Sequence, residues 1–474
     1  VLLHRVLLGP PSRDGGLPPG GTLRPGAARD GRELSACVRA CVCALVLAFS
    51  PSCTGDAAPS LQEEAAHASF PRPVDCADVS EGADLQAVID AAEAGATLCL
   101  AAGSYRGPLV VGQRVTIWGP PAAVVRSPGK GTTFEIEGDG AALLGFTVDG
   151  SGGRFDTLDA AVHVVADDVR IEGIRVRNAA FGVLVEKANR ASILNNLVEG
   201  PDEGPLGLRG DGIRLWETRD SEVRGNRVIG SRDMVIWYSS NNRLIDNTVV
   251  RSRYGTHFMY SHDNVVRGNR YIDNVVGIFI MYSRNLELRE NLLARSSGPG
   301  GMGLGIKESG NLTVSDNAFI ANTKGVYMDT TPLEPADFNT FENNAFFHSE
   351  VAILMHSSEK RNAFRGNTFV SNHSQLQVEG GGNALAVDWQ GNSFDDYVGY
   401  DMDHDGFGDI PYELRRLSSQ LESTYPQLQF FRGGITLELL DAISSMFPML
   451  EPETTLVDPR PRLGALEWKA FDAR

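Results

Sequence analysis

A short motif recurs every 22 residues along the middle of the chain. The triplets Trp237-Tyr238-Ser239, Met259-Tyr260-Ser261 and Met281-Tyr282-Ser283 are each followed, eight residues after the serine, by Asn247, Asn269 and Asn291. A period of this length, with short runs of β-branched and aromatic residues, is typical of one coil of a parallel β-helix and is too short for a helical-hairpin repeat. The repeat therefore predicts a solenoid in which equivalent residues of successive coils stack in columns.

A turn element of the form Asn-x-apolar extends this pattern over nine coils. It begins at Asn196, Asn226, Asn247, Asn269, Asn291, Asn317, Asn344, Asn367 and Asn392. We expect each asparagine to take the left-handed backbone conformation and to bond its side-chain amide to the stacked asparagine of the next coil. The apolar residue two positions later is expected to point into the core, so both columns are interpreted as structural.

The predicted fold class is all-β, a right-handed parallel β-helix over residues 70–412. Residues 1–57 are interpreted as a leader with a secretory signal, because the apolar run 40–49 follows Arg32 and Arg39 and is too short to span a bilayer. This predicts export to the periplasm, with lipidation at Cys53 as an open alternative. Residues 413–474 are expected to form a partly helical tail.

The cysteines and the charge agree with an exported protein that does not bind nucleic acid. Cys76 and Cys99 are the pair certain to lie in the folded part, and an export route predicts a disulfide between them. The formal net charge is −17 and the pI is about 5.0, and no Lys/Arg stripe recurs at the coil period. These features argue against a nucleic-acid partner.

The tail contains an apolar pattern with helical spacing from Thr436 to Phe447. Two interpretations stay open for this predicted helix. It either caps the last coil of the solenoid or docks on a partner.

Alignment of the coils on the triplet predicts a column that faces outward. Its members are Trp216, Trp237, Met259, Met281, Lys307, Met328 and Met355. His257 lies two residues before Met259 and therefore on the same face of its strand, while His262 and His356 lie close to the column in sequence. Thioether and imidazole donors together favour Cu(I), so His257, Met259, His262, Met281, Met328, Met355 and His356 are candidate copper ligands. The competing interpretation is that the methionines fill gaps in the core.

A second candidate metal site is the Asp-rich stretch 401–409. Asp401, Asp403, Asp405 and Asp409, with Gly406 at the sharp turn, match the first part of a calcium loop. The residue at the twelfth position is Tyr412 rather than a glutamate, so a regular EF-hand is not predicted. The alternative is a turn whose carboxylates bond backbone amides.

An enzyme is the rival function, because secreted β-helices often cleave or epimerise acidic polysaccharides. Candidate groups are Asp211, Asp233, His257, His262, Asp263, Lys307, Glu308 and Asp329. Such sites usually need several carboxylates, or a base and a neutralising cation, on neighbouring coils, and the sequence shows no clear convergent set. We therefore predict that the chain is not an enzyme and keep a lyase, hydrolase or epimerase as the alternative.

The segment Gly255-Thr256-His257-Phe258-Met259-Tyr260-Ser261-His262-Asp263, together with the Asp-rich loop that ends Gly408-Asp409-Ile410-Pro411-Tyr412, resembles the NosD family within the wider superfamily of β-helical carbohydrate-binding and sugar-hydrolysis domains. The resemblance implies an exported accessory protein, peripheral to the membrane, for assembly of the copper cluster of nitrous-oxide reductase in denitrification. The implied partners are the membrane and ATPase subunits of an ABC transporter, a copper chaperone and the reductase.

Under this resemblance the Met/His face is expected to hold copper transiently. A metal-free structural adaptor for the transporter is the third candidate function, beside copper handling and an enzyme. Lys307 interrupts the column of soft donors, which argues against one continuous copper track.

Overall fold

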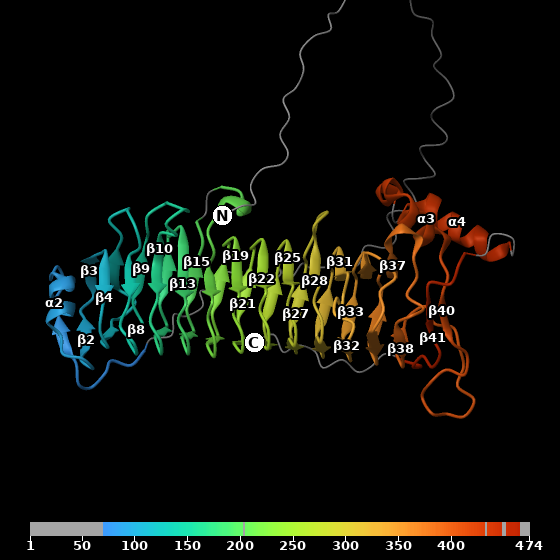
Figure 1. Cartoon of the computed structure of the whole chain (residues 1–474). Helices are drawn as coiled ribbons and strands as arrows, with labels where there is room; N and C mark the ends of the chain where they lie inside the picture. The colour runs from blue at the N-terminus through green and yellow to red at the C-terminus, as the bar shows by residue number, and fades with distance from the viewer. Residues whose placement is uncertain (1–69, 202–203, 432–433, 448–451, 465–474) are drawn as a thin grey trace, which may run out of the picture. The chain divides into compact units, whose positions relative to one another are not determined.

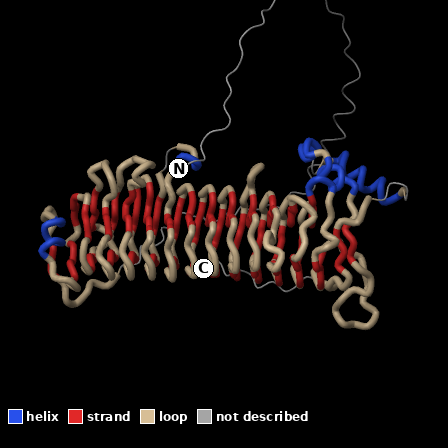
Figure 2. Tube along the Cα trace, viewed as in Figure 1, coloured by secondary structure: helices blue, strands red, loops and turns tan. Residues whose placement is uncertain are grey.

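The chain forms a parallel β-helix whose coils are each built from three short strands (Figure 1; Figure 2). The computed structural model describes residues 70–201, 204–431, 434–447 and 452–464. Within these ranges the predicted all-β fold is confirmed. The predicted leader 1–57, with Cys53, lies outside them.

The first strand of each coil belongs to a 14-stranded parallel sheet. Its strands are β1 (Ala77–Val79), β2 (Thr97–Leu100), β5 (Thr116–Trp118), β8 (Ala142–Leu144), β11 (Arg170–Glu172), β14 (Ser192–Leu194), β17 (Glu222–Arg224), β20 (Arg243–Ile245), β23 (Val265–Arg267), β26 (Glu287–Arg289), β29 (Thr313–Ser315), β32 (Asn339–Glu342), β35 (Asn362–Arg365) and β38 (Asp388–Gln390).

The second strand of each coil belongs to a 13-stranded parallel sheet. Its strands are β3 (Gly103–Arg106), β6 (Ala123–Arg126), β9 (Thr147–Asp149), β12 (Arg175–Arg177), β15 (Leu197–Glu199), β18 (Arg227–Ile229), β21 (Thr248–Val250), β24 (Arg270–Ile272), β27 (Leu292–Ala294), β30 (Ala318–Ile320), β33 (Ala345–Phe347), β36 (Thr368–Val370) and β39 (Ser393–Phe394).

The third strand belongs to a 12-stranded parallel sheet, which carries the candidate site. Its strands are β4 (Leu109–Val111), β7 (Phe134–Ile136), β10 (Ala160–Val164), β13 (Phe181–Glu186), β16 (Ile213–Trp216), β19 (Asp233–Trp237), β22 (Tyr254–Met259), β25 (Val276–Met281), β28 (Met302–Lys307), β31 (Lys324–Asp329), β34 (Val351–Met355) and β37 (Ser374–Val378). A 3-10 turn, η1 (Leu206–Leu208), lies between β15 and β16, and another, η2 (Glu379–Gly381), follows β37.

The predicted asparagine ladder is confirmed as a continuous chain of buried hydrogen bonds. At each step both the backbone N–H and the Nδ2 of one asparagine donate to the Oδ1 of the next, as between Asn247 and Asn269, at 2.9 Å each. The ladder ends where the backbone N–H and Nδ2 of Asn392 both donate to the carboxylate of Asp458. Because an unpaired buried amide is costly, this chain fixes the register of one coil on the next.

The predicted backbone conformation of these asparagines is wrong by one residue. The positive φ belongs to the residue before each ladder asparagine, as at Asp246 and Glu290, or at Gly225 and Gly268, where the absence of a Cβ favours this conformation. The preceding residue makes the turn, which leaves the asparagine free to bond along the solenoid axis.

The core fills the interior of the coils with stacked side chains. The predicted inward residues of the turn element are all buried, and Phe319, Phe346, Phe369 and Phe394 stack in one column with ring centroids 4.8–5.0 Å apart. This spacing equals the separation of adjacent strands, so the coil repeat itself sets the aromatic contact.

The N-terminal end is closed by a short helix and a covalent link. α2 (Leu85–Ala91) begins at Asp84, whose carboxylate accepts from the N–H of Ala87 at 3.2 Å, and it buries Leu85 and Ile89 against the first coils. The predicted disulfide between Cys76 and Cys99 is confirmed, and it joins the segment before β1 to β2.

The C-terminal end begins before the boundary expected at residue 412. The parallel sheets end at β39, and β40 (Tyr412–Leu414) pairs antiparallel with β41 (Leu456–Asp458). The ring of Tyr412 stacks on Phe394 with centroids 3.9 Å apart, so this ribbon covers the last coil.

The predicted tail helix is present as α4 (Ile435–Met446), beside α3 (Leu417–Thr424) and the 3-10 segment η3 (Pro426–Phe431). α3 contacts β37 and η2, and the carboxylate of Asp441 in α4 accepts from the N–H of Ser418 at 2.7 Å. α3 therefore lies against the last coils and holds α4. No helix among the described residues is long and apolar enough to cross a membrane.

Candidate metal site

The outward column of the 12-stranded sheet changes its chemistry from coil to coil. Strand pairing stacks Trp216, Trp237, Met259, Met281, Lys307 and Asp329 in that order. The residues that precede them, Leu215, Ile236, Phe258, Ile280 and Ile306, are fully buried in the core. Met259 and Met281 are half-buried, which confirms that this part of the column faces outward.

His257 and Met281 form the closest pairing of soft donors in the column. His257 Nε2 lies 3.4 Å from Met281 Sδ, on the neighbouring strand. Met259 is the strand partner of Met281 and lies two residues after His257, so the three side chains share one face of β22 and β25. Metal–nitrogen and metal–sulfur bonds of about 2.0 and 2.3 Å place the two donors about 3.5 Å apart at a tetrahedral angle, so the observed separation fits one bridging ion.

Aromatic rings surround the imidazole of His257. The ring centroids of Tyr254, Trp237 and Phe279 lie 5.0, 5.3 and 6.1 Å from that of His257. His257 is 7% exposed, and neither its Nδ1 nor the Nε1 of Trp237 has a hydrogen-bond partner among the described residues. The rings form an aromatic wall around His257, and its Nε2 faces the thioether of Met281.

This environment holds His257 in its neutral form. Burial lowers the pKa of His257 to about 4. The carboxylate of Asp233 acts to raise this pKa, and the charges of Arg253 and Arg232 act to lower it. A metal ligand must present a free lone pair, which only the neutral imidazole has. Above a pH of about 4 the imidazole of His257 therefore keeps the free lone pair that a metal ion needs.

A buried ion pair supports the aromatic wall from one side. The carboxylate of Asp233, fully buried, accepts from Arg253 Nε at 2.9 Å and from the N–H of Tyr254 at 3.2 Å. The guanidinium of Arg253 lies 4.6 Å from the ring centre of Tyr254. Asp233 and Arg253 thus fix Tyr254, which in turn packs against His257.

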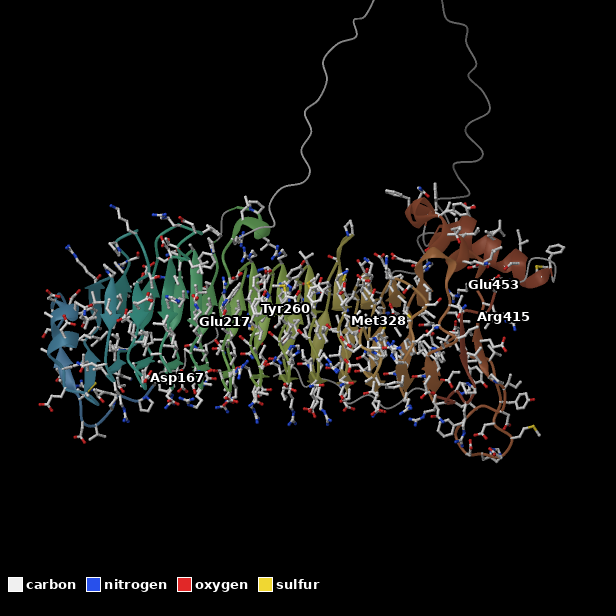
Figure 3. The ribbon with its side chains drawn as sticks, in the orientation of Figure 1. Asp167, Glu217, Tyr260, Met328, Arg415 and Glu453 are labelled. Carbon is white, nitrogen blue, oxygen red and sulfur yellow. A yellow bond between two sulfur atoms is a disulfide. The ribbon has the colours of Figure 1, made fainter. Side chains whose placement is uncertain are left out.

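The alignment that placed Met328 and Met355 in the outward column is wrong. Met328 is the strand partner of Ile306 and of Met355, and both methionines are fully buried in the core. Asp329 occupies the outward position above Lys307. Met328 and Met355 fill the interior, as the competing interpretation predicted for methionine. They are therefore not available to an ion on the outer face. Figure 3 labels Met328.

His262 and His356 are engaged elsewhere. His262 lies in the turn after β22, where its Nδ1 accepts from the N–H of Arg284 at 3.1 Å. His356 is exposed and its Nδ1 pairs with the carboxylate of Glu379 at 2.7 Å. The structure therefore brings together His257, Met259 and Met281 from the predicted ligands and gives the two other histidines different partners.

The serine and the tyrosine of the triplet have separate structural roles. Ser239, Ser261 and Ser283 are buried, and the N–H of each serine donates to the hydroxyl of the next. Tyr260, labelled in Figure 3, stacks between Tyr238 and Tyr282 at centroid distances of 5.4 and 4.8 Å. The stacked rings cover one another's faces, so this row presents ring edges and hydroxyls beside the methionines.

Five of the eight groups considered for an enzyme lie in ion pairs, namely Asp211, Asp233, Lys307, Glu308 and Asp329. Lys307 Nζ contacts Asp329 at 2.6 Å and Glu308 at 3.7 Å. Asp211, whose pKa burial raises to about 6, pairs with Arg232 at 2.7 Å. Each cation is already neutralised by a carboxylate of the same face.

The Asp-rich loop brings three of its four carboxylates together. Oxygen atoms of Asp401, Asp403 and Asp405 lie within 4.8 Å of one another, whereas Asp409 accepts from the N–H of Met402 at 2.7 Å. Asp401 also accepts from the N–H groups of Asp405 and Gly406. The cluster has the ligands that calcium prefers, and it also satisfies the loop backbone in the way predicted for an Asp-rich turn.

Comparison with known proteins finds sequence similarity to one family. Residues 200–399 match the family described as periplasmic copper-binding protein (NosD). Two proteins named "Probable ABC transporter binding protein NosD" are similar over 74% of this chain. The relative from Pseudomonas aeruginosa is 29% identical over 377 residues and covered over 84% of its length, and the one from Stutzerimonas stutzeri is 28% identical over 366 residues and covered over 83%. The chain resembles the NosD proteins. The NosD match includes His257, Met259 and Met281 and ends before the Asp-rich loop.

Solved structures share the fold at low identity. The A-module of the mannuronan C-5 epimerase AlgE6 from Azotobacter vinelandii is 15% identical with a TM-score of 0.53, over 66% of this chain and 94% of that module. The catalytic unit of a GH87 α-1,3-glucanase from Streptomyces thermodiastaticus is 16% identical with a TM-score of 0.56, over 70% of each chain. These similarities support the parallel β-helix and carry no activity over to this chain.

Sequence reasoning missed the aromatic wall and its support. Phe279 could have been found, because it stands in the coil after His257 at the same distance before the triplet. Tyr254 and the Asp233–Arg253 pair had no such signal, since β19 and β22 shift register between Asp233 and Val235. The correct position of Met328 was readable from Thr331, which follows Asp329 at the spacing at which Ser309 follows Lys307.

Proposed function

We propose that this chain is an exported accessory protein that holds Cu(I) transiently on His257, Met259 and Met281 during assembly of the copper cluster of nitrous-oxide reductase. The observation that carries the proposal is the 3.4 Å approach of His257 Nε2 to Met281 Sδ, beside Met259, where both methionines are half-buried on the outer face of the sheet. Copper is cargo in this scheme and not a permanent part of the protein. The family description, periplasmic copper-binding protein, supports the same role and compartment.

The donor set selects the ion by its softness. Two thioethers and a neutral imidazole bring no negative charge, and soft donors of this kind favour Cu(I) over magnesium, calcium or zinc. Lys307 is the next residue of the column beyond Met281. An ion would therefore stay at the β22–β25 step instead of passing further along the column, and it would enter and leave through the outer face.

The named relatives support an association with a transporter. Both carry the name of an ABC transporter binding protein. In this chain the apolar surface of α4 offers a docking element, since Ile435 is 85% exposed and Met446 75% exposed. We propose that α4 binds the membrane subunit of the transporter, which works with its ATPase subunit, and that the copper chaperone delivers the ion to the face of His257.

The proposal is non-enzymatic. A polysaccharide lyase, hydrolase or epimerase would need a free base and a cation aimed at a bound sugar. The cations of this face are instead paired with carboxylates, as between Lys307 and Asp329. If the chain were an enzyme, the group of Lys307, Glu308 and Asp329 would be the candidate catalytic site.

The test is an anaerobic Cu(I) titration of the purified protein against a competing chelator. Met259→Leu and Met281→Leu remove one sulfur each at nearly constant volume, and His257→Phe keeps an aromatic ring in the pocket. Each change is expected to weaken Cu(I) binding about 10-fold or more, which corresponds to about 1.4 kcal/mol or more. Met402→Leu, at a loop residue that is 76% exposed, is the matched control and should leave the affinity unchanged.

Two results would reject the site. Equal Cu(I) affinity in the parent and in all three site variants would place copper elsewhere. No Cu(I) binding by the parent would favour the metal-free adaptor. If the same preparation still binds the transporter, the protein is folded and the lack of copper binding is genuine.

A further inference from the structure

A glycine interrupts the outward column that contains His257. Strand pairing stacks His257, Phe279, Gly305 and Tyr327 on β22, β25, β28 and β31. Gly305 does not have a positive φ, so its backbone conformation does not require glycine. The reason for a residue without a side chain therefore lies in the space above it.

The ring of Phe279 fills the space above Gly305. A Cβ at position 305 would lie 2.2 Å from Cδ2 and 2.4 Å from Cε2 of Phe279, well inside van der Waals contact. The Sδ of Met302 lies 3.3 Å from the same point, on the outer face of the same strand. Any side chain at position 305 would thus displace the Phe279 ring, and Met302 closes one direction of its escape.

The lean of Phe279 over β28 keeps its ring off the imidazole of His257. The two ring centroids are 6.1 Å apart and the ring planes are inclined at 60°. Where rings of adjacent strands stack in the core, as Phe319 and Phe346 do, the centroids are 4.8 Å apart and the planes are nearly parallel. The space between His257 and Phe279 is therefore wider than a stacked column would leave.

That space borders the two donors that lie closest together. Met281 follows Phe279 by two residues on the same face of β25, and its Sδ lies 3.4 Å from Nε2 of His257. On the inner side the donors are backed by the buried core residues Phe258 and Ile280, so an ion reaches them from the outer face. A Phe279 ring stacked on His257 would stand beside both donor atoms on that route.

We propose that Gly305 keeps the copper donors accessible by giving the ring of Phe279 a place over β28. This inference rests on the proposed function, and it makes Gly305 a positioning residue that does not itself contact the ion. With a side chain at position 305, the ring moves back toward β22 and covers Nε2 of His257 and Sδ of Met281. The donors are then all present but closed to an ion.

The first measurement is the anaerobic Cu(I) titration applied to Gly305→Ala. We expect the affinity to fall about 10-fold or more, and we expect Phe279→Leu in the same chain to restore it to within about 3-fold of the parent, because the shorter side chain does not reach position 305. Phe279→Leu alone should bind as the parent does. Gly112→Ala, at a glycine after β4 whose added Cβ would have nothing within 4 Å, is the matched control and should leave the affinity unchanged.

The second measurement needs no copper. The methyl groups of methionine are isotope-labelled and observed by NMR, and the signal of Met281 is assigned as the one that Met281→Leu removes. Gly305→Ala should shift this signal, because the Phe279 ring comes to lie beside it, and the double variant should return it to the parent position. The signals of Met328 and Met355, both in the core, report that the solenoid stays folded.

The two measurements separate this inference from the proposed function. If the parent binds Cu(I) and Gly305→Ala binds it equally well, the proposed function stands and the role of Gly305 is rejected. If the Met281 signal does not shift in Gly305→Ala, the ring goes elsewhere and the inference is rejected whatever copper does. If the parent binds no Cu(I), the proposed function fails and the access role falls with it. Loss of the core methionine signals in both Gly305→Ala and the double variant would also reject the inference, since the glycine would then be needed for the fold itself.

Discussion

At His257, burial has two effects that act together. It removes the charge from the imidazole, and it places Nε2 against the thioether of Met281, beside three aromatic rings. A more exposed histidine would hold a proton at mildly acidic pH and compete with a metal ion. Met259 and Met281 were predictable as outward residues because the triplet fixes their register, whereas the neutral state of His257 depends on rings and charges that come from other coils.

His163 makes the stability of the fold depend on pH, because its pKa is raised, whereas that of His257 is lowered. Burial lowers the pKa of His163, but Glu135 and Glu186 on the adjacent strands outweigh burial, and the net shift is upward. A raised folded-state pKa stabilises the protein below the unfolded value of about 6.5, and this contribution is lost as the pH rises through the folded-state pKa. We expect His163→Gln to lower the urea midpoint more at about pH 5.5 than at about pH 8.5.

The control for that prediction is His348→Gln, at a histidine in a turn with no ion pair among the described residues. Its effect on the urea midpoint should not depend on pH. An equal loss for His163→Gln at both pH values would contradict the ion-pair interpretation.

At the scale of the structural element, the asparagine ladder is the device that repeats in every coil. Asn269 accepts from the N–H and Nδ2 of Asn247 and donates onward to Asn291. Asn269→Ala would leave these buried groups unpaired, and each unpaired group costs about 1–3 kcal/mol. We expect a loss of about 2–4 kcal/mol in the free energy of unfolding, measured by urea denaturation.

Thr313→Ala on the outer face of β29 is the comparison for the ladder variant and should change the free energy of unfolding by less than about 0.5 kcal/mol. A similarly small effect of Asn269→Ala would mean that water replaces the amide in the turn.

The Asp-rich loop is an element with its own prediction. Calcium should bind where Asp401, Asp403 and Asp405 converge, displacing the contact between Asp405 and Arg460. We expect calcium to raise the thermal midpoint of the parent, and we expect Asp401→Asn to abolish the increase while magnesium gives none in either protein. If the midpoint is the same with calcium and with EDTA, the loop is an Asp-rich turn that needs no ion.

For the whole molecule, the sequence predicts the fold better than it predicts the site. The 22-residue period and the Asn-x-apolar turns determine strand pairing over nine coils, because every coil repeats the same requirement on the same residues. The site depends on one register shift between β19 and β22 and on single residues of separate coils. Neither feature recurs at the coil period, so the repeat does not predict them. The error at Met328 arose from matching residue type across coils instead of following the buried Ser and Thr positions.

The apolar C-terminal helix carries the prediction that concerns the assembly. Ile435→Ser with Leu439→Ser should reduce co-purification with the transporter from membranes, since both residues are more than half exposed and α3 already covers the last coils. Val398→Ser, at an apolar loop residue that is 95% exposed, should bind as the parent does. Unchanged co-purification of the α4 variant would assign docking to another surface, provided that its urea midpoint equals that of the parent.

The way in which the asparagine ladder ends also bears on how such a chain can change in length. Each asparagine both receives hydrogen bonds from the coil before and gives them to the coil after, and Asp458 receives two without giving any along the ladder. Asp458 therefore accepts ladder hydrogen bonds only from the last asparagine, Asn392, whatever the number of asparagines before it. An in-frame duplication or deletion of one coil in the gene would leave both ends chemically satisfied, so descendants of this chain can acquire a longer or shorter working surface in a single genetic step.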